Sequence, residues 1–309
     1  ALVTVPASVV INWTRELRRF APGLTVNVYY GTQRSLEPKA NVLLTTYGTL
    51  RQDIEKLKDK KWRVAVADEA QNIKNPGSQI FQDMCIIRAD SAIAMSGTPV
   101  ENRLADYWAI MEFVNPGLFG TLGTFVTEYA QPIERSRDAD AVRRLRGVTA
   151  PFILRRLKTD KSVIADLPDK ISSDRFCALT PEQAAMYQTF VSDGLAGVTE
   201  TLTKLERSAR VLKLILRLKQ ICDAPELFSK DPKITGPEHS GKAEMLLDLL
   251  EELTGNGQKA IVFTQFREMG DLLVSWIGER LGTVPDFIHG GVSVKKRQEM
   301  VDRFQNDPQ

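Results

Sequence analysis

Short apolar runs alternate with amphipathic stretches through the first hundred residues of the chain. The runs of strand length are Leu2–Val5, Leu24–Tyr30, Val42–Thr46, Val64–Ala67 and Ala92–Met95. Ser8 is expected to cap a helix that runs through Trp13 and Leu17, and Leu50–Leu57 also has helical spacing. Strands that alternate with helices predict a parallel sheet with right-handed crossovers, which is an α/β fold.

The pattern becomes mainly helical from about Leu104. Tyr107–Val114 has helical spacing, and long amphipathic helices are predicted within residues 180–222, starting at Thr180-Pro181. A loop at 231–237 indicates a boundary.

The α/β pattern then resumes after this loop. Strands are predicted at Ala260–Thr264 and around Phe287–His289, between helices at Lys242–Leu253, Glu268–Leu281 and about Lys295–Phe304. We therefore expect a first α/β lobe at 1–115, a helical insertion and linker at 116–238, and a second α/β lobe at 239–309.

Composition narrows the class of protein. Hydrophobic residues make up 43% of the 309 residues and charged residues 26%, which is typical of a globular protein, and no apolar stretch is long enough for a membrane span. The three cysteines are far apart, which favours a reducing compartment and excludes a zinc site with the two histidines. The net charge of +2 hides two basic clusters, at 143–161 and 204–219. Either cluster is as compatible with a solvated helix face as with contacts to a phosphate backbone.

Asp68 and Glu69 follow a predicted buried strand directly, so both carboxylates are expected at the carboxyl edge of the sheet, where open α/β sheets bind ligands. Such a pair suits Mg²⁺-nucleotide chemistry, in which one carboxylate holds the metal and the other orients water. Ser96, Gly97 and Thr98 follow the next strand in the same way. Alone, each pair or triplet could simply begin a helix, but together they indicate an ATP-driven motor.

Small hydroxyl residues and free N–H groups also follow two other strands. Pro6-Ala7-Ser8 and Thr45-Thr46-Tyr47 suit phosphate oxygens and would read no base sequence, although helix capping explains them as well. Gln265 is a similar candidate in the second lobe. Arg155, Arg156 and Lys158 could bridge lobes or touch DNA, or form a solvated face. The tryptophans are assigned to packing.

The order of these segments resembles the SWI/SNF-like family of superfamily-two helicase-related ATPases, which are DNA translocases. The segments that carry the resemblance are Leu2–Ser8 with Asn12, Trp13 and Glu16; Leu44–Tyr47; Asp68–Asn75; Ser96–Asn102; Phe152–Lys158; Leu218–Cys222; Ile261–Phe266; and His289–Gly291. They occur in the family's order along the whole chain, and the compact lobes suggest a bacterial member.

The resemblance implies two RecA-like parallel-sheet lobes with a helical insertion, and it assigns roles to residues. Asp68 would hold Mg²⁺, Glu69 would activate water, and Gln71, Ser96, Gly97 and Thr98 would belong to the ATP site and its coupling. The chain has no G-x-x-x-x-G-K-[ST] motif, and Gly241-Lys242 lacks its glycine-rich loop. The resemblance therefore implies a fragment with both lobes incomplete, lacking a phosphate loop before residue 1 and an arginine-finger motif after residue 309.

The expected function is an ATP-dependent, double-stranded DNA translocase that uses ATP and Mg²⁺ and remodels protein–DNA complexes. Its partners would be duplex DNA and a DNA-bound protein such as a polymerase or a nucleoid protein. A monomer in the cytoplasm, associated with the nucleoid, is expected, or a nuclear protein in a eukaryote. Two alternatives stay open: an RNA helicase of the same superfamily, and, for this chain alone, a non-catalytic module that binds DNA or a partner.

Overall fold

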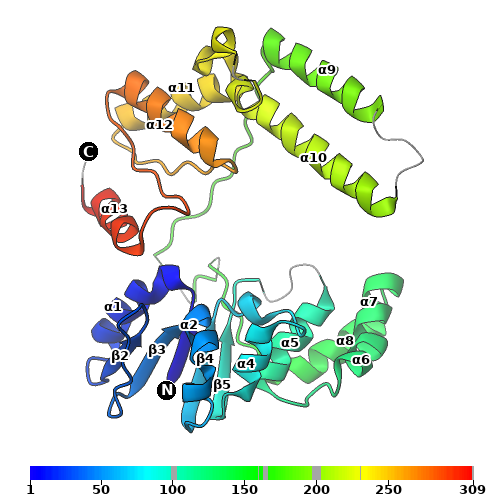
Figure 1. Cartoon of the computed structure of the whole chain (residues 1–309), viewed down its shortest axis with the longest axis vertical. Coiled ribbons are helices and arrows are strands. Elements are labelled where there is room, and N and C mark those ends of the chain that lie inside the picture. The colour runs from blue at the N-terminus through cyan, green and yellow to red at the C-terminus, as the bar shows by residue number, and fades with distance from the viewer. Residues whose placement is uncertain (99–102, 159, 163–165, 197–202, 230, 308–309) are drawn as a thin grey trace. The chain divides into compact units, whose positions relative to one another are not determined.

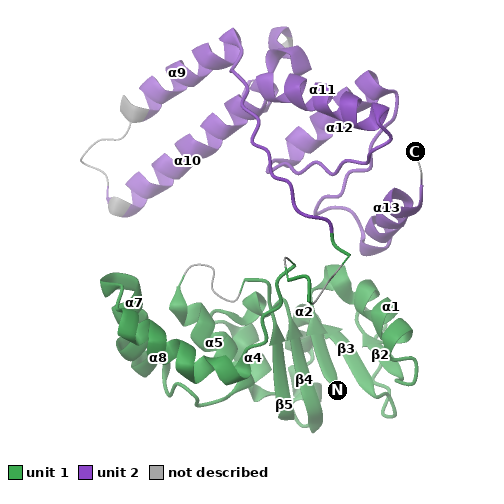
Figure 2. Ribbon diagram, turned by 180° about the vertical axis from the view of Figure 1, so that it is seen from behind, with its two compact units in different colours: residues 1–167 green, residues 168–309 purple. Residues whose placement is uncertain are grey.

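The computed structural model divides the chain into two compact units, residues 1–167 and residues 168–309 (Figure 2). It describes residues 1–98, 103–158, 160–162, 166–196, 203–229 and 231–307. Each unit has a hydrophobic core of its own. Among the described residues, none of the helices is both long and apolar enough to cross a membrane.

Unit 1 is built on a sheet of five parallel strands in the order β2-β3-β1-β4-β5 (Figure 1). The strands are β1 (Leu2–Val5), β2 (Val26–Tyr29), β3 (Val42–Thr46), β4 (Trp62–Asp68) and β5 (Ala89–Met95). Each overlaps a strand predicted from the sequence. The parallel α/β expectation is confirmed for this unit.

Helices pack on both faces of the sheet because alternate strand residues point to opposite sides. Val3 and Val5 belong to a core cluster that includes α1 (Val10–Phe20), whereas Leu2 belongs to the larger cluster on the other face. The helices that contribute to the larger cluster are α2 (Tyr47–Gln52), α3 (Ile54–Leu57), α4 (Gln79–Ile86), α5 (Leu104–Val114), α6 (Leu122–Phe125) and α8 (Ala139–Thr149). α7 (Gln131–Ser136) packs beside α8.

Two local expectations for unit 1 were wrong. Ser8 does not cap a helix: it lies in a short 3₁₀ turn, η1 (Ala7–Val9), and α1 begins after Val9 without a side-chain cap. The helix expected over Leu50–Leu57 is instead interrupted at Asp53, which lies between the end of α2 at Gln52 and the start of α3 at Ile54.

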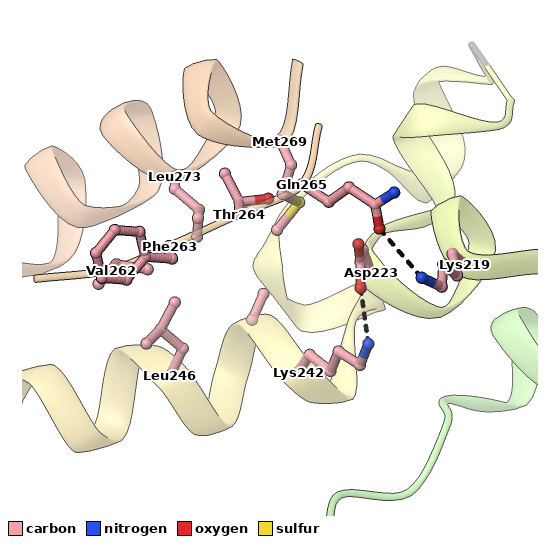
Figure 3. A pocket seen from close by; sticks show the side chains of 11 residues that line it. Lys219, Asp223, Lys242, Leu246, Val262, Phe263, Thr264, Gln265, Met269 and Leu273 are labelled. Carbon is pink, nitrogen blue, oxygen red and sulfur yellow. Dashed lines mark hydrogen bonds and ion pairs between the residues drawn. The ribbon is translucent and has the colours of Figure 1, made fainter. Parts of the chain in front are cut away.

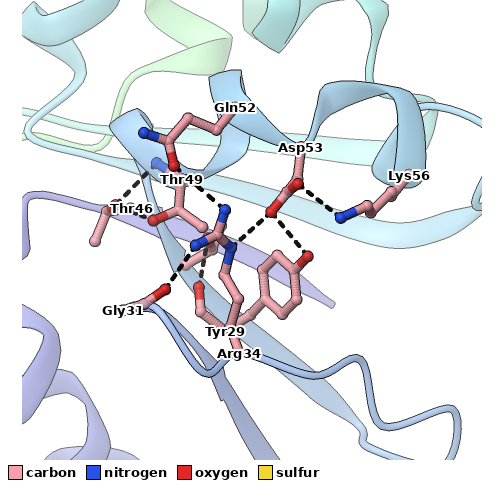
Figure 4. A network of polar contacts seen from close by, with 9 residues as sticks. Tyr29, Gly31, Arg34, Thr46, Thr49, Gln52, Asp53 and Lys56 are labelled. Atoms are coloured by element: carbon pink, nitrogen blue, oxygen red, sulfur yellow. Dashed lines mark hydrogen bonds and ion pairs between the residues drawn. The ribbon is translucent and has the colours of Figure 1, made fainter.

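Asp53 is the centre of a buried polar network that ties the end of β2 to α2 (Figure 4). Its carboxylate, in a residue only 8% exposed, accepts hydrogen bonds from Lys56 Nζ (2.9 Å), Arg34 Nε (2.6 Å) and the Tyr29 hydroxyl (2.9 Å). The hydrogen bonds from Lys56 and Arg34 lower the pKa of Asp53 to about 2. This carboxylate is thus fully paired within the fold.

Unit 2 contains the remaining long helices. They are α9 (Pro181–Ala196), α10 (Lys204–Asp223), α11 (Gly241–Gly255), α12 (Arg267–Leu281) and α13 (Val294–Asn306). Gln183, fully buried, joins three of them: its Nε2 donates to Ile221 O at 2.7 Å, and its Oε1 accepts from the backbone N–H of Gly241 at 3.2 Å. Gly241 is required here because a Cβ would lie 2.0 Å from Ala178 O.

The two strands predicted for this half of the chain, at Ala260–Thr264 and around Phe287–His289, do not form. Both segments are irregular, and the described part of unit 2 contains no strand. A strand obtains its backbone hydrogen bonds only from a neighbouring strand, and neither segment pairs with the other or with a third. Apolar side chains consequently remain uncovered, with Phe263 91% exposed.

Asp53→Asn is expected to lower the free energy of unfolding by about 1.5–3 kcal/mol near neutral pH, the usual range for hydrogen bonds to a charged group. Because the pKa is about 2 in the folded chain and near 3.9 when unfolded, this contribution is present above the unfolded value and is lost as the pH falls toward 2. Urea unfolding at several pH values checks this prediction. The exposed Asp59→Asn is the control, and a wild-type advantage over Asp53→Asn that is constant with pH would contradict it.

Candidate nucleotide site at the strand ends

Asp68 ends β4 and is held at both carboxylate oxygens. Its register partner is Met95, the last residue of β5, so the segments that follow the two strands start side by side. Trp13 Nε1 donates to Asp68 Oδ2 at 2.7 Å, and the backbone N–H of Glu69 donates to Oδ1 at 2.9 Å. The half-buried carboxylate is therefore fixed in direction by two neutral donors.

Tyr47 holds the backbone of the same residue. Its hydroxyl donates to Asp68 O at 2.6 Å, and the residue is 8% exposed. Burial, followed by the nearby charges of Asp68 and Glu69, raises the pKa of Tyr47 well above its ordinary value. The phenol is thus a neutral hydrogen-bond donor near neutral pH.

Glu69 has a left-handed backbone, with φ 50° and ψ 55°. A residue with a Cβ rarely adopts this conformation, which costs about 1–3 kcal/mol and is concentrated at functional sites. Its side chain is half-buried, and Glu69 Oε2 accepts a hydrogen bond from Gln71 Nε2 at 2.7 Å. The strained turn places this carboxylate beside Asp68, at the edge of the sheet.

Gln71 joins the two segments that the sequence marked for nucleotide chemistry. While its Nε2 donates to Glu69, its Oε1 accepts a hydrogen bond from Ser96 Oγ at 2.9 Å. Ser96 Oγ also accepts from the backbone N–H of Thr98 at 3.1 Å. The Gln71 amide therefore connects the acidic turn after β4 with the serine after β5. A displacement of one of these segments would change the hydrogen bond to the other.

Gly97 and Thr98 are exposed at the end of β5. A Cβ on Gly97 would meet no atom within 4 Å, so contacts within the chain do not require glycine here. This space would admit a ligand close to the backbone. The remainder of the motif, residues 99–102, lies outside the described residues.

The segments predicted to touch DNA after β1 and β3 differ in exposure. Pro6 and Ala7 are half-buried and Ser8 is exposed. Thr45 is fully buried, its hydroxyl donating to Tyr29 O at 2.9 Å, and buried Thr46 caps α2 by accepting from Thr49 N at 3.2 Å.

These two threonine hydroxyls are therefore committed within the fold. Of the two segments, only the one after β1 offers an exposed hydroxyl, that of Ser8. Whether either segment touches DNA stays a prediction.

The remaining candidates lie apart from this edge. Arg155, Arg156 and Lys158 are exposed in an irregular stretch of unit 1. Gln265 belongs to unit 2, where its Oε1 accepts from Lys219 Nζ at 3.2 Å beside a cavity of about 390 Å³ (Figure 3). That cavity is also lined by Asp223 and Lys242, which form an ion pair of 2.7 Å.

Trp13 is the residue that sequence reasoning missed. We assigned it to packing, and it does pack against a core cluster, but its indole N–H is also a hydrogen-bond donor to Asp68. An indole nitrogen on an otherwise apolar helix face was the available signal, because a buried tryptophan usually finds a partner for its N–H. The partner itself could not be read, since Asp68 lies 55 residues further along the chain.

An acidic pair at one strand end and a serine linked to it at the next strand end are the arrangement that the sequence predicted for a nucleotide site. Comparison with known proteins agrees with this prediction. The model of the SNF2-related domain matches residues 1–227, and that of the helicase conserved C-terminal domain matches residues 241–309. The chain therefore belongs to the SNF2-related, helicase-like family, and the resemblance seen in the sequence is confirmed.

Bacterial and archaeal proteins are among the similar ones. The putative ATP-dependent helicase/translocase YwqA of Bacillus subtilis is 37% identical over 317 residues, covering 98% of this chain and 34% of that protein. The uncharacterized ATP-dependent helicase MG018 of Mycoplasma genitalium is 31% identical, covering 98% of this chain and 29% of that protein. The chain thus spans about a third of the length of the curated relatives it matches.

A solved structure also aligns with the whole chain. The Sulfolobus solfataricus SWI2/SNF2 ATPase core in complex with double-stranded DNA is 40% identical, with a TM-score of 0.53, and the match covers 100% of this chain and 65% of that one. This likeness confirms the α/β fold class expected for this chain, which is that of SWI2/SNF2 ATPase cores. The domain boundaries expected from the sequence, at residues 115 and 238, stay predictions. The structure itself separates two compact units after residue 167.

The strain at Glu69 predicts an unusual order of stability. Glu69→Gly is expected to be more stable than Glu69→Ala by about 1 kcal/mol, because glycine adopts positive φ without a Cβ clash. Both variants lack the carboxylate, so the comparison isolates the backbone. Urea unfolding of the two variants tests it. The control is the pair Gln82→Gly and Gln82→Ala at an exposed position of α4, where the alanine variant should be the more stable. The same order of stability at both positions would contradict the prediction.

Proposed function

We propose that the complete protein hydrolyses ATP and uses the energy to move along double-stranded DNA and to remodel protein–DNA complexes. The observation that carries this proposal is the Gln71 amide, which contacts both the Glu69 carboxylate and the Ser96 hydroxyl. A motor needs such a link between the hydrolytic carboxylate and a neighbouring segment, because the loss of the γ-phosphate must be converted into movement.

The residues present fit a magnesium ion that accompanies the nucleotide. Mg²⁺ at nucleotide sites is usually held by one or two carboxylates together with substrate phosphates and water, and Asp68 and Glu69 supply two adjacent carboxylates at the edge of the sheet. Asp68 would hold it, since each carboxylate oxygen accepts one hydrogen bond and retains a free lone pair. The ion would neutralise charge on the phosphates.

Glu69 is the proposed general base. Its carboxylate is adjacent to Asp68 and is oriented by the amide of Gln71 at 2.7 Å. In this role it takes a proton from the attacking water, a contribution of about 10²–10⁴-fold in rate. The left-handed backbone of Glu69 supports the assignment, because strained backbone of this kind clusters at active sites.

Duplex DNA is the proposed track. The solved relative with a full match is described as a complex with double-stranded DNA, and the segments after β1 and β3 lie on the same sheet edge as Asp68. Exposed Ser8 and backbone N–H groups suit phosphate oxygens, and exposed Arg155, Arg156 and Lys158 add positive charge. Contacts of this kind read no sequence, which suits a protein that must step over any base.

The protein that is displaced, the oligomeric state and the location in the cell are parts of the same proposal. The displaced protein would be one bound to DNA, such as a polymerase or a nucleoid protein, and the motor would act as a monomer in the cytoplasm, associated with the nucleoid. An RNA helicase and a non-catalytic binding module are the competing functions, and the experiments below separate them.

Glu69→Gln in the complete protein is expected to lower the DNA-stimulated rate of ATP hydrolysis by at least ~10²-fold while ATP still binds, because only the proton-accepting group is lost. Phosphate release and equilibrium nucleotide binding are the two measurements. Exposed Glu37→Gln serves as the control and should hydrolyse ATP normally. Normal turnover by Glu69→Gln would sink the assignment, and a wild-type protein without any hydrolysis would favour the binding module.

Linear double-stranded DNA should stimulate hydrolysis more than double-stranded RNA of equal length does. Because the proposed contacts are to phosphates, the affinity for DNA should fall steeply with salt and should change little with sequence. Titrations at several salt concentrations with two unrelated DNA sequences check both points. Stronger stimulation by RNA would replace the translocase with the helicase alternative.

A further inference from the structure

Three segments of unit 1 meet at the single residue Asp68. Trp13 comes from α1, which follows the Pro6–Ser8 segment after β1. Tyr47 is the first residue of α2, directly after Thr46. Tyr47 therefore belongs to one of the segments that are proposed to face DNA, and Trp13 lies in the helix that directly follows the other. Both donate hydrogen bonds to the residue that is proposed to hold the metal.

The two contacts restrain different parts of Asp68. Trp13 Nε1 lies 2.7 Å from Oδ2 and fixes the direction of the carboxylate, while the Tyr47 hydroxyl lies 2.6 Å from the carbonyl oxygen and fixes the end of β4. Glu69 N completes the set at Oδ1. With these donors in place, Asp68 has little freedom to turn away from its present direction.

The connection between each donor and its segment is short and stiff. Tyr47 follows Thr46, whose hydroxyl caps α2 through Thr49 N and contacts Thr49 Oγ1 at 2.9 Å. Trp13 lies in the first turn of α1, and Val10, at the start of the same helix, is buried in the core cluster that Trp13 joins. A displacement of either segment therefore displaces the donor rather than being absorbed by a loop.

Trp13 makes a polar contact in addition to its packing contacts. Trp62, also in unit 1, has an indole nitrogen that is buried without any hydrogen-bond partner. The indole of Trp13, by contrast, is directed at a carboxylate that belongs to the candidate site. The two tryptophans thus differ in the one atom on which the inference depends.

We propose that Trp13 and Tyr47 are positioning residues that couple contact with the DNA backbone to the orientation of Asp68, and hence to binding of the metal–nucleotide complex. The inference rests on the proposed function. DNA that binds to the segments after β1 and β3 would act on both donors, and through them on the direction of the Asp68 carboxylate.

The test uses Trp13→Phe and Tyr47→Phe in the complete protein. Tyr47→Phe removes the hydroxyl and keeps the ring, whereas Trp13→Phe removes the N–H by replacing the indole with a smaller aromatic ring. Binding of a fluorescent, non-hydrolysed ATP analogue is titrated with Mg²⁺, with and without linear double-stranded DNA. The half-maximal Mg²⁺ concentration should rise about 10-fold or more, as for other residues that orient a metal ligand. The fold-change that DNA produces in this concentration should shrink in both variants.

Trp62→Phe is the matched control, because it makes the same chemical change at an indole without a partner. It should keep the wild-type Mg²⁺ dependence. Wild-type Mg²⁺ dependence in both Trp13→Phe and Tyr47→Phe would overturn the inference, as would unfolding of both variants, since the two polar groups would then be structural. If Glu69→Gln abolishes hydrolysis while these variants bind like the wild type, only the coupling fails and the proposed function stands.

Discussion

The parallel direction of the five strands is the constraint on which the rest of unit 1 depends. In parallel strands every carboxyl end lies at the same edge, and the register aligns Thr46 with Val5 and Asp68 with Met95, each the last residue of its strand. Segments that are far apart in the chain must therefore emerge side by side. Hydrogen bonds from Trp13, Tyr47 and Ser96 then join what the sheet has brought together.

Much of the fold of unit 1 could be predicted because the spacing of apolar residues along the chain indicates its strands and helices. Apolar runs marked every strand of unit 1, and α5 (Leu104–Val114) lies where helical spacing indicated it. In unit 2, α9 (Pro181–Ala196) begins at the predicted Thr-Pro start. The segment Ala260–Thr264 has an equally strong apolar pattern but forms no strand. A helix satisfies its own backbone, whereas a strand depends on a neighbour, so the same local signal is reliable for one and conditional for the other.

The candidate site was predictable in its members and not in its contacts. Position at a strand end placed Asp68, Glu69 and Ser96 together, but nothing local indicated that the Gln71 amide would join two of them. The threonines at the end of β3 show that residue type alone does not predict whether a side chain is available to a ligand. Their hydroxyls suited phosphate by type, yet Thr45 is buried and bonded to Tyr29 O, a result of packing between strands that a single sequence does not reveal.

Two aspartates of unit 1 show that the charge of the hydrogen-bond donors around a carboxylate determines whether it can bind a cation. Asp53 is paired with Lys56 and Arg34, so its charge is neutralised within the fold and is available only for stability. Asp68 receives its hydrogen bonds from an indole and a backbone amide, which orient it without cancelling its charge. A cationic donor at the position of Trp13 would repel a divalent ion. A neutral donor fixes the direction of Asp68 and leaves its charge free for a cation, which is why a tryptophan suits this position.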